Sequence, residues 1–518
     1  MATPAGAAQT ASSSRFVKNV LWTWIGVALT MFAGLVLSPY VIHKLGAEGY
    51  GIWALLFSLI GYYGLLDLGI RSALVRYTAF FHAQHEPAKI NELINTVIAY
   101  YTAGASVLLL ISIFISMHAD RIFHVSPAFR HDFSRLIIVV GLSSMLGLNV
   151  FSAALQGLQR FGLSTRIAVV AIGIRSLGAF LLLYLGFGLL ALGINVLFAQ
   201  VFGYVVGYGA LRRAMPEFRL SLRMARFRML RGIWNYSVHT FMATVAIQLL
   251  YQSPAILIGL FRPAAFIGYF SFPSKLVNYS GDFIQRVGDV SHSAGTALAA
   301  RGTPDQLRRL AVYSNRYCLA LFMPLAIFLV AYGRELLYVW ISPEFAANSA
   351  PAISALVLSG ALAMAAQYNS GALLFALAEH RRYSRALLVE AALSISLMAL
   401  AIPRYGVAGA AWGFAIPMTV IRGFVTPWLL ARSIRTSYAP FMASILGGPL
   451  LAAAPVFALA AAARRAFLPG ANWPQLIGAG AAITLLYFGI AAFTSLDRQH
   501  RQLGVRWARQ LAARLPGA

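Results

Sequence analysis

Long apolar stretches, separated by short clusters of charged, glycine and proline residues, fill the chain from Val20 almost to its end. A membrane-spanning helix needs about 20 mostly apolar residues, and about 14 such stretches recur here. Their predicted starts lie near Val20, Tyr50, Asn95, Leu136, Ile167 and Leu190, then Ile233, Phe266, Ser314, Ala350, Arg385 and Val407, and last Phe441 and Gln475. The pattern predicts an all-α polytopic membrane protein with about 14 transmembrane helices.

A long internal repeat relates the first six predicted spans to the next six. ALQGLQRFGLSTR (154–166) follows the fourth span and LLFALAEHRRYSR (373–385) follows the tenth, and both end in a hydroxyl residue and an arginine. LGAEGYGIW (45–53) joins spans one and two, as RPAAFIGYF (262–270) joins spans seven and eight. A shift of six spans preserves orientation, so we predict two pseudo-symmetric six-helix bundles, an arrangement that in transporters alternates access to a central site.

The repeat and the charge clusters divide the chain into six predicted parts. These are a cytosolic N-terminal tail (1–19), an N-terminal six-helix bundle (20–211), a basic cytosolic linker (212–232), a C-terminal six-helix bundle (233–435), two additional C-terminal helices (436–496) and a basic cytosolic tail (497–518). The first apolar segment is too long for a typical signal peptide. We therefore expect an uncleaved first span.

The composition agrees with a membrane protein, and the charge predicts its orientation. The chain is 59% hydrophobic and 11% charged, whereas soluble domains are about 25% charged. A net charge of +26 in a soluble protein would suggest nucleic acid. Here the basic residues fall mainly in every second loop, which excludes that partner and predicts cytoplasmic termini and basic loops against anionic lipid. Cys318 is the only cysteine, so an internal disulfide or a cysteine-based metal site is impossible.

The stretch PYVIHKLGAEGYGIWALLFSLIGYYGLLDLGIRSALVRY (39–77) pairs a Leu-Gly-x-x-x-x-Gly turn with a following Asp-Leu-Gly and a downstream Arg. It resembles the opening of the polysaccharide-export (O-antigen flippase) family. In the second half, IGLFRPAAFIGYFS, ALAARGTPDQLRRL, MPLAIFLVAYGRELLYVWISPEFAANSAP and RYGVAGAAWGFA follow in the family's order between residues 258 and 415. The resemblance covers roughly residues 18–435.

This family belongs to the multidrug/oligosaccharidyl-lipid/polysaccharide superfamily, so the resemblance implies the fold of the MATE exporters. It implies translocation of an undecaprenyl-diphosphate-linked oligosaccharide, a repeat unit of O-antigen, capsule or exopolysaccharide, from the cytoplasmic to the periplasmic leaflet of the bacterial inner membrane. The expected partners are this lipid-linked oligosaccharide, membrane lipids, and the polymerase and glycosyltransferases of the same pathway. No catalytic activity, cofactor or metal is expected.

The sequence departs from the family at one position. Many relatives carry an aspartate in span seven, a few residues before an Ile-Gly pair. Here the segment reads LLYQSPAILIG, with Gln252, Ser253 and Pro254 in that region. No role tied to that acid is therefore carried over to this chain.

Three cations lie deep within predicted spans: Arg175, Lys275 and Arg422. A cation at the bilayer centre costs about 2.5 to 3.5 kcal/mol, so it normally faces partners or water inside the bundle. Few acids lie near these three in sequence, which favours a central cavity that binds diphosphate or acidic sugars through charge-assisted hydrogen bonds. The alternative is that each cation pairs with a backbone carbonyl or with Glu390.

Other charged residues are predicted to lie at the cytoplasmic ends of the spans. Asp67 and Arg71 have the i to i+4 spacing of a helical ion pair, and Asp282 and Arg286 repeat it. We predict that these pairs form a gate or an anchor at the cytoplasmic mouth. Arg76 is assigned to the inner surface, and Asp289 and Glu390 are candidates for ion coupling.

Two other classes of membrane protein remain open from sequence. A polytopic glycosyltransferase or polymerase would need carboxylates or a metal on a large outer loop, and the largest one, HADRIFHVSPAFRHD (118–132), is short. A MATE-type ion-coupled exporter of lipophilic cations would need an acidic cavity, yet deep carboxylates are scarce. A positively charged cavity would therefore favour the flippase, whose cargo carries a diphosphate, and a negatively charged cavity would favour the exporter of cations.

Overall fold

The computed structural model describes the backbone of residues 4–67, 69–147, 150–226, 228–301, 304–464, 471–497 and 500–502. Within these ranges the chain is helical and contains no strand. The chain divides into two compact units, Met1–Gly268 and Tyr269–Ala518, which are described separately here. The predicted all-α class is confirmed.

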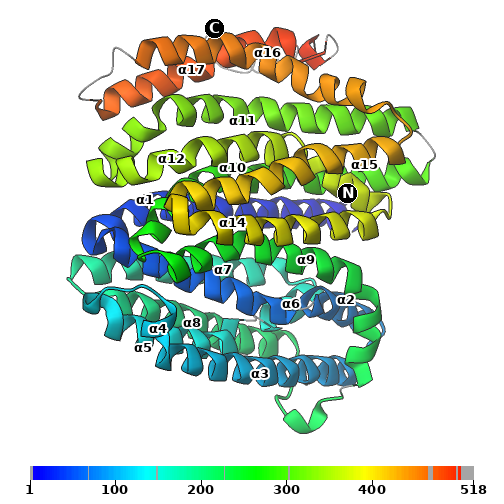
Figure 1. The fold of residues 1–518 in the computed structure, drawn as a ribbon. Helices are drawn as coiled ribbons and strands as arrows, with labels where there is room; N and C mark the ends of the chain where they lie inside the picture. Colours follow the sequence, from blue (N-terminus) through cyan, green and yellow to red (C-terminus); the bar gives the residue numbers. More distant parts are fainter. Residues whose placement is uncertain are drawn as a thin grey trace, which may run out of the picture. The chain divides into compact units, whose positions relative to one another are not determined.

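The first unit consists of long helices joined by short turns (Figure 1). Its elements are α1 (Pro4–Tyr63), η1 (Gly64–Asp67), α2 (Ile70–Ala83), α3 (Pro87–Met117), α4 (Ala119–Ile122), α5 (Pro127–Gly147), α6 (Val150–Gly157), α7 (Phe161–Tyr184), α8 (Leu189–Ala214), η2 (Leu222–Met224) and α9 (Arg228–Phe261). In this unit α3 packs against α5, α5 against α8, α8 against α7, and α7 against α1. The helix α9 packs against α1 in this unit. The sequence pattern placed most of α9 in the predicted C-terminal bundle (233–435).

The second unit contains two π-helical segments among its helices. Its elements are α10 (Ala265–Ala300), which begins in the first unit, α11 (Pro304–Trp340), α12 (Pro343–Ser359), η3 (Gly360–Ala365), α13 (Tyr368–Ala376), α14 (His380–Met418), η4 (Thr419–Val425), α15 (Thr426–Ser433), α16 (Tyr438–Arg464) and α17 (Trp473–Thr494). The segments η3 and η4 are π-helical and pack against each other. Both C-terminal helices, α16 and α17, pack on α11.

Ten stretches of the described chain are long and apolar enough to cross a membrane. Leu29–Asp67 and His380–Ser433 are 39 and 54 residues long, whereas one crossing needs about 20. Each contains a glycine break, at Gly46 (φ 74°) and at Gly406 (φ 54°), and each therefore holds two predicted spans. A positive φ is costly for residues with a Cβ, which explains glycine at both breaks. The ten stretches hold twelve of the predicted spans, and the other two fall on the helices of residues 127–147 and 265–300, so the structure is consistent with fourteen.

The internal repeat found in the sequence has a matching backbone conformation in the two units. Gln159 ends α6 with φ 61° and Ala378 ends α13 with φ 59°, and each lies four residues after the repeated leucine, Leu155 or Leu374. The amide of the next residue donates back to that leucine's carbonyl, at 2.8 Å from Arg160 and 2.9 Å from Glu379. A left-handed residue closing a helix in this way satisfies carbonyls that have no partner within the helix.

The two repeated loop segments of the sequence contact each other inside the first unit. A Cβ on Gly51 would lie 1.9 Å from the carbonyl oxygen of Ala264, and a Cβ on Gly268 would lie 2.6 Å from that of Ala47. Gly51 and Gly268 occupy equivalent positions of the segments 45–53 and 262–270. The two glycines therefore allow a reciprocal backbone contact that no other residue permits without a shift.

We expect Gly51→Ala to lower the free energy of unfolding by about 1 to 3 kcal/mol, because the added methyl group overlaps backbone atoms that cannot rotate away. Gly489→Ala in α17 is the matched control, because nothing lies within 4 Å of its Cβ position and alanine favours a helix by about 1 kcal/mol. Thermal unfolding of the purified proteins in detergent measures both. Equal stability of the two variants would contradict the contact.

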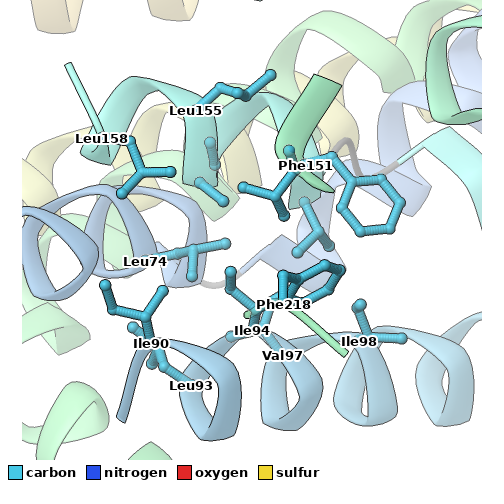
Figure 2. Close-up of a cluster of buried hydrophobic side chains, with 14 of the residues drawn as sticks. Leu74, Ile90, Leu93, Ile94, Val97, Ile98, Phe151, Leu155, Leu158 and Phe218 are labelled. Carbon is cyan, nitrogen blue, oxygen red and sulfur yellow. The ribbon is translucent and has the colours of Figure 1, made fainter. Parts of the chain in front are cut away.

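A buried apolar cluster packs one end of the first unit (Figure 2). It joins α2, α3 and α6 through residues such as Leu74, Ile94 and Phe151, all of which are at most 2% exposed. Phe218, from the segment between α8 and α9, is 1% exposed and stacks edge-on against Phe151 at 6.2 Å. The segment that the sequence described as a cytosolic linker is therefore anchored in the core of this unit.

Candidate functional site

Asp67 lies at a break in the chain and not within a continuous helix. It ends the 3₁₀ turn η1, Gly69 follows with φ 79°, and α2 begins at Ile70. One carboxylate oxygen accepts from the backbone N–H of Arg71 at 2.8 Å and from the Tyr101 hydroxyl of α3 at 2.6 Å. Asp67 therefore caps the start of α2, where the helix dipole favours a negative charge.

This geometry corrects one prediction from the sequence. A helical i to i+4 ion pair between Asp67 and Arg71 requires an unbroken helix, and the turn at Gly69 interrupts it. Among the described side chains, that of Arg71 is exposed and forms no ion pair with Asp67. Arg76 is also exposed on α2. The role of these residues at a cytoplasmic mouth stays a prediction.

Arg175 lies on the protein-facing side of α7, far from either end of the helix. Ala179 and Leu183, four and eight residues later, are buried, whereas the exposed Leu177 and Tyr184 project from the opposite face. The side chain is half-buried, and no described carboxylate forms an ion pair with it. Its positive charge is therefore not compensated within the described part of the chain.

The polar face predicted in span eight lies on α10. Lys275 is half-buried, and its Nζ atom lies 6.0 Å from the centroid of the Tyr279 ring, within the range of a cation–π interaction. The side chains of Asp282, Arg286 and Asp289 lie outside the described residues. The predicted Asp282–Arg286 pair and the coupling role of Asp289 therefore stay predictions.

Arg422 is paired with Glu390. From the sequence, this pairing was the alternative to a cavity in which Arg422 binds an anionic cargo. Its Nε atom lies 2.9 Å from Oε1 and 3.0 Å from Oε2 of Glu390. The Glu390 side chain is 0% exposed and that of Arg422 is 12% exposed. A buried pair of this kind compensates both charges, so Arg422 differs from Arg175 in having an anion already beside it.

The Arg422 side chain starts from the π-helical segment η4. This segment packs against the second π-helical segment, η3, and against α14, which carries Glu390. The wider turn of a π-helix shifts the side chains that follow it, and such segments occur frequently at functional sites. The structure therefore brings together a buried ion pair, which the sequence analysis gave only as an alternative, and two irregular helical segments, which it did not predict.

Two glutamines of α9 fill the region where the sequence departs from the family. Gln248 donates to the carbonyl oxygen of Gly61 at 3.0 Å, and Gln252 donates to the Gln248 side chain at 3.3 Å. A Cβ at Gly61 would lie 2.4 Å from Gln252, so the glycine creates the space for this amide. Neutral amides thus hold α9 to α1 in this region.

A buried polar network that sequence analysis missed fixes the start of α13 in the second unit. The Asn315 side chain of α11 donates to the Ser370 hydroxyl at 2.8 Å and accepts from the backbone N–H of Asn369 at 3.1 Å. Ser370 in turn donates to Gln367 at 2.8 Å. All four residues are at most 2% exposed. The signal in the sequence was the run Gln-Tyr-Asn-Ser inside an apolar span.

The outer loop considered for catalysis holds an ordinary surface ion pair. Asp120 lies 3.0 Å from the Arg130 guanidinium, and both side chains are 49% exposed. Among the described residues, no group of three or more His, Cys, Asp or Glu side chains is placed to hold a metal ion. In the described spans the structure shows paired buried charges, at Arg422–Glu390 and Arg464–Glu335, and the half-buried Arg175, for which anion binding stays a prediction.

Residues 16–284, about half of the chain, match the family described as polysaccharide biosynthesis protein. The chain belongs to this family. The chain is 23% identical to EpsK, an uncharacterized membrane protein of Bacillus subtilis (strain 168), over 94% of this chain and 97% of EpsK. It is 20% identical to a putative O-antigen transporter of Shigella flexneri, over 80% and 98% of the two chains. The resemblance drawn from the sequence motifs is confirmed.

Solved structures with the same fold include two classes of transporter. The lipid II flippase MurJ, in an inward closed conformation, aligns with a TM-score of 0.69 at 13% identity, over 92% of this chain and 98% of MurJ. An inward-facing MATE-family multidrug transporter of the MOP superfamily aligns with a TM-score of 0.61 at 13% identity, over 80% and 96%. At this identity the likeness concerns the fold alone, and the predicted MATE-like fold is confirmed.

Proposed function

We propose that this member of the family is a flippase that moves a polyprenyl-diphosphate-linked oligosaccharide across the bacterial inner membrane without changing it chemically. The observation that carries the proposal is Arg175, a half-buried cation on the protein-facing side of a spanning helix, with no described carboxylate partner. A diphosphate is the kind of anion that a guanidinium binds through paired, charge-assisted hydrogen bonds. The names of the O-antigen transporter and the lipid II flippase indicate the same class of cargo.

In this proposal the chain has cytoplasmic termini and alternates access to the cargo site. Arg175 binds the diphosphate, with Lys275 and Arg422 as the two other predicted cations. Arg422 has to leave Glu390 before it can bind cargo, because its Nε atom already donates a hydrogen bond to the Glu390 carboxylate and is ion-paired with it. Glu390 likewise has to become exposed before it can exchange an ion, since its side chain is 0% exposed.

A MATE-type exporter of lipophilic cations is the rival function, and the described carboxylates argue against it. The two buried carboxylates in the described chain are Glu335 and Glu390. Glu335 lies 2.9 Å from the Arg464 guanidinium, and Glu390 is paired with Arg422. A buried carboxylate that already has a cationic partner offers little to attract a second cation.

Reconstituted protein tests the proposed function directly. We expect proteoliposomes to move a polyprenyl-diphosphate oligosaccharide from one leaflet to the other, measured by the loss or gain of access to an added glycosidase. The same vesicles loaded with a fluorescent lipophilic cation should show no transport beyond that of empty vesicles. Transport of the cation but not of the oligosaccharide would overturn the proposal and favour the exporter.

A further inference from the structure

The segment Met215–Arg226, between α8 and α9, is held against α3 by side chains that imitate a neighbouring strand. The amide of Asn91 donates to the carbonyl of Glu217 and accepts from the N–H of Arg219, both at 2.9 Å. Asn95, one helical turn later in α3, makes the same two bonds two residues further along the segment. It donates to the carbonyl of Arg219 and accepts from the N–H of Ser221, both at 2.8 Å. We call this segment the strap.

The strap is fixed on its inner side by burial as well as by hydrogen bonds. Thr96 accepts from the N–H of Arg226 at 2.8 Å, and Asn91, Asn95 and Thr96 are at most 4% exposed. Phe218 enters the apolar cluster of the first unit (Figure 2). Such buried side-chain bonds cost free energy when broken. The strap is therefore a fixed part of the first unit.

The outer side of the strap exposes both apolar and cationic side chains. Leu220 and Leu222 are 51% and 65% exposed, and Arg219 and Arg223 beside them are exposed too. Glu217 is the one acidic residue of the strap. Two leucines held out of the core between arginines are unfavourable in water but suit a surface that is apolar below and anionic above.

The length of α3 places the strap at the level of the lipid headgroups. With 31 residues the helix is about 46 Å long, whereas the hydrocarbon core of a bilayer is about 30 Å thick. Its exposed apolar residues, such as Val107, Leu110 and Phe114, lie in the C-terminal half. The N-terminal turns that carry Asn91 and Asn95 therefore extend about 15 Å beyond the core, where the headgroups lie.

We propose that the outer side of the strap binds the anionic phospholipids of the surrounding leaflet. Arg219 and Arg223 donate hydrogen bonds to headgroup phosphates, while Leu220 and Leu222 enter the boundary between the headgroups and the acyl chains. Charge complementarity identifies this occupant, because the leaflet next to basic loops is the anionic one. The surface is independent of the proposed cargo site at Arg175 and goes beyond the transport function.

A fluorescent reporter on the strap tests this proposal in the full-length protein. The buried Cys318 is first replaced by serine, and Leu222→Cys then carries an environment-sensitive dye. The protein is placed in nanodiscs of phosphatidylcholine with increasing phosphatidylglycerol and a lipid-borne quencher. We expect a blue shift and quenching that grow with phosphatidylglycerol. A dye that stays in water at every composition would overturn the proposal.

Matched charge variants show whether the strap arginines cause this response. Arg219→Gln with Arg223→Gln should raise the phosphatidylglycerol fraction needed for half-maximal quenching about thirtyfold, or beyond the accessible range, because each basic residue contributes near an anionic surface. Arg308→Gln with Arg309→Gln, two exposed positions of α11, removes the same charge elsewhere and should leave the curve unchanged. If both double variants lose the same amount of quenching, the response depends on the net charge of the protein and not on the strap arginines, and the proposal is overturned.

The same reporter separates membrane phospholipid from the diphosphate of a lipid-linked cargo. A polyprenyl diphosphate is added to phosphatidylcholine nanodiscs at the same total charge as phosphatidylglycerol. An equal or stronger response to phosphatidylglycerol supports the proposal. A response to the polyprenyl diphosphate alone would make the strap a cargo site and would overturn the proposal that it binds membrane phospholipid. The proposed transport function would not be affected by that result, because it is tested separately by transport in proteoliposomes.

Discussion

Replacing Arg175 by glutamine is expected to lower the transport of a polyprenyl-diphosphate oligosaccharide about tenfold or more. A hydrogen bond to a charged group contributes about 1.5 to 3 kcal/mol, and a guanidinium can donate two to a diphosphate. The variant should keep its stability, since the lost cation has no described ion-pair partner and removing an unpaired charge from the membrane is not destabilising. Reconstituted transport and thermal unfolding measure the two effects.

Two further variants make the Arg175 experiment specific. Arg175→Lys keeps the charge but loses the planar fork of donors, so partial activity is expected. Arg166→Gln removes an exposed cation from the same helix, α7, and should transport normally. Normal transport by Arg175→Gln at normal protein levels would remove the observation on which the proposed function rests.

The second large effect is expected in stability, from the buried pair in the second unit. Arg422→Met leaves the Glu390 carboxyl group 0% exposed and without its partner. Breaking a buried ion pair from one side costs about 3 to 5 kcal/mol, because the remaining group must either stay charged without compensation or take up a proton. We therefore expect a markedly lower unfolding temperature for purified Arg422→Met in detergent.

A double variant distinguishes a structural pair from a cargo site. Glu390→Gln together with Arg422→Met removes both charges and should restore most of the lost stability, as is seen when buried pairs are replaced as a unit. If the restored protein transports normally, Arg422 serves the structure alone. If it is stable but inactive, the pair takes part in transport, through the predicted binding role of Arg422 or the predicted coupling role of Glu390. No recovery of stability would show that the pair is not the cause of the loss.

The fold was largely predictable because its main signals are local. Apolar stretches of spanning length identify the helices, and Gly46 and Gly406 mark two of the breaks between them. The sequence repeat at Leu155 and Leu374 has a structural counterpart, because Gln159 and Ala378 have the same left-handed conformation. Period, length and glycine position are all visible in a single sequence.

The environment of Asp67 was mispredicted although a local signal existed. Helical spacing to Arg71 suggested an ion pair, but Gly64 and Gly69 flank the acid and favour a break in the helix. Once the helix stops, the carboxylate accepts hydrogen bonds from the Arg71 N–H of α2 and from the Tyr101 hydroxyl. Helix-end chemistry outweighed the i to i+4 pattern here.

The tertiary contacts could not be predicted, because their partners are far apart in sequence. Glu390 and Arg422 are separated by 32 residues, a kink at Gly406 and a change from α-helix to π-helix, and the sequence offered Glu390 only as an alternative partner of the deep cations. Asn91 and Asn95 contact a segment that begins more than one hundred residues later, and nothing local distinguishes them from polar residues facing a neighbouring helix. Such contacts depend on how the helices pack in three dimensions. The order of apolar and polar residues along a single sequence does not show which distant residues will meet.

The reciprocal contact of Gly51 with Ala264 and of Gly268 with Ala47 also constrains how this chain can evolve. In a two-fold symmetric homodimer, residue i of one subunit contacts residue j of the other, and j contacts i. The repeat shows this relation inside one polypeptide, as expected if a gene encoding a half-length ancestor was duplicated and fused. The two copies have diverged at most positions, but neither glycine is free to change, because each accommodates a backbone carbonyl from the other copy.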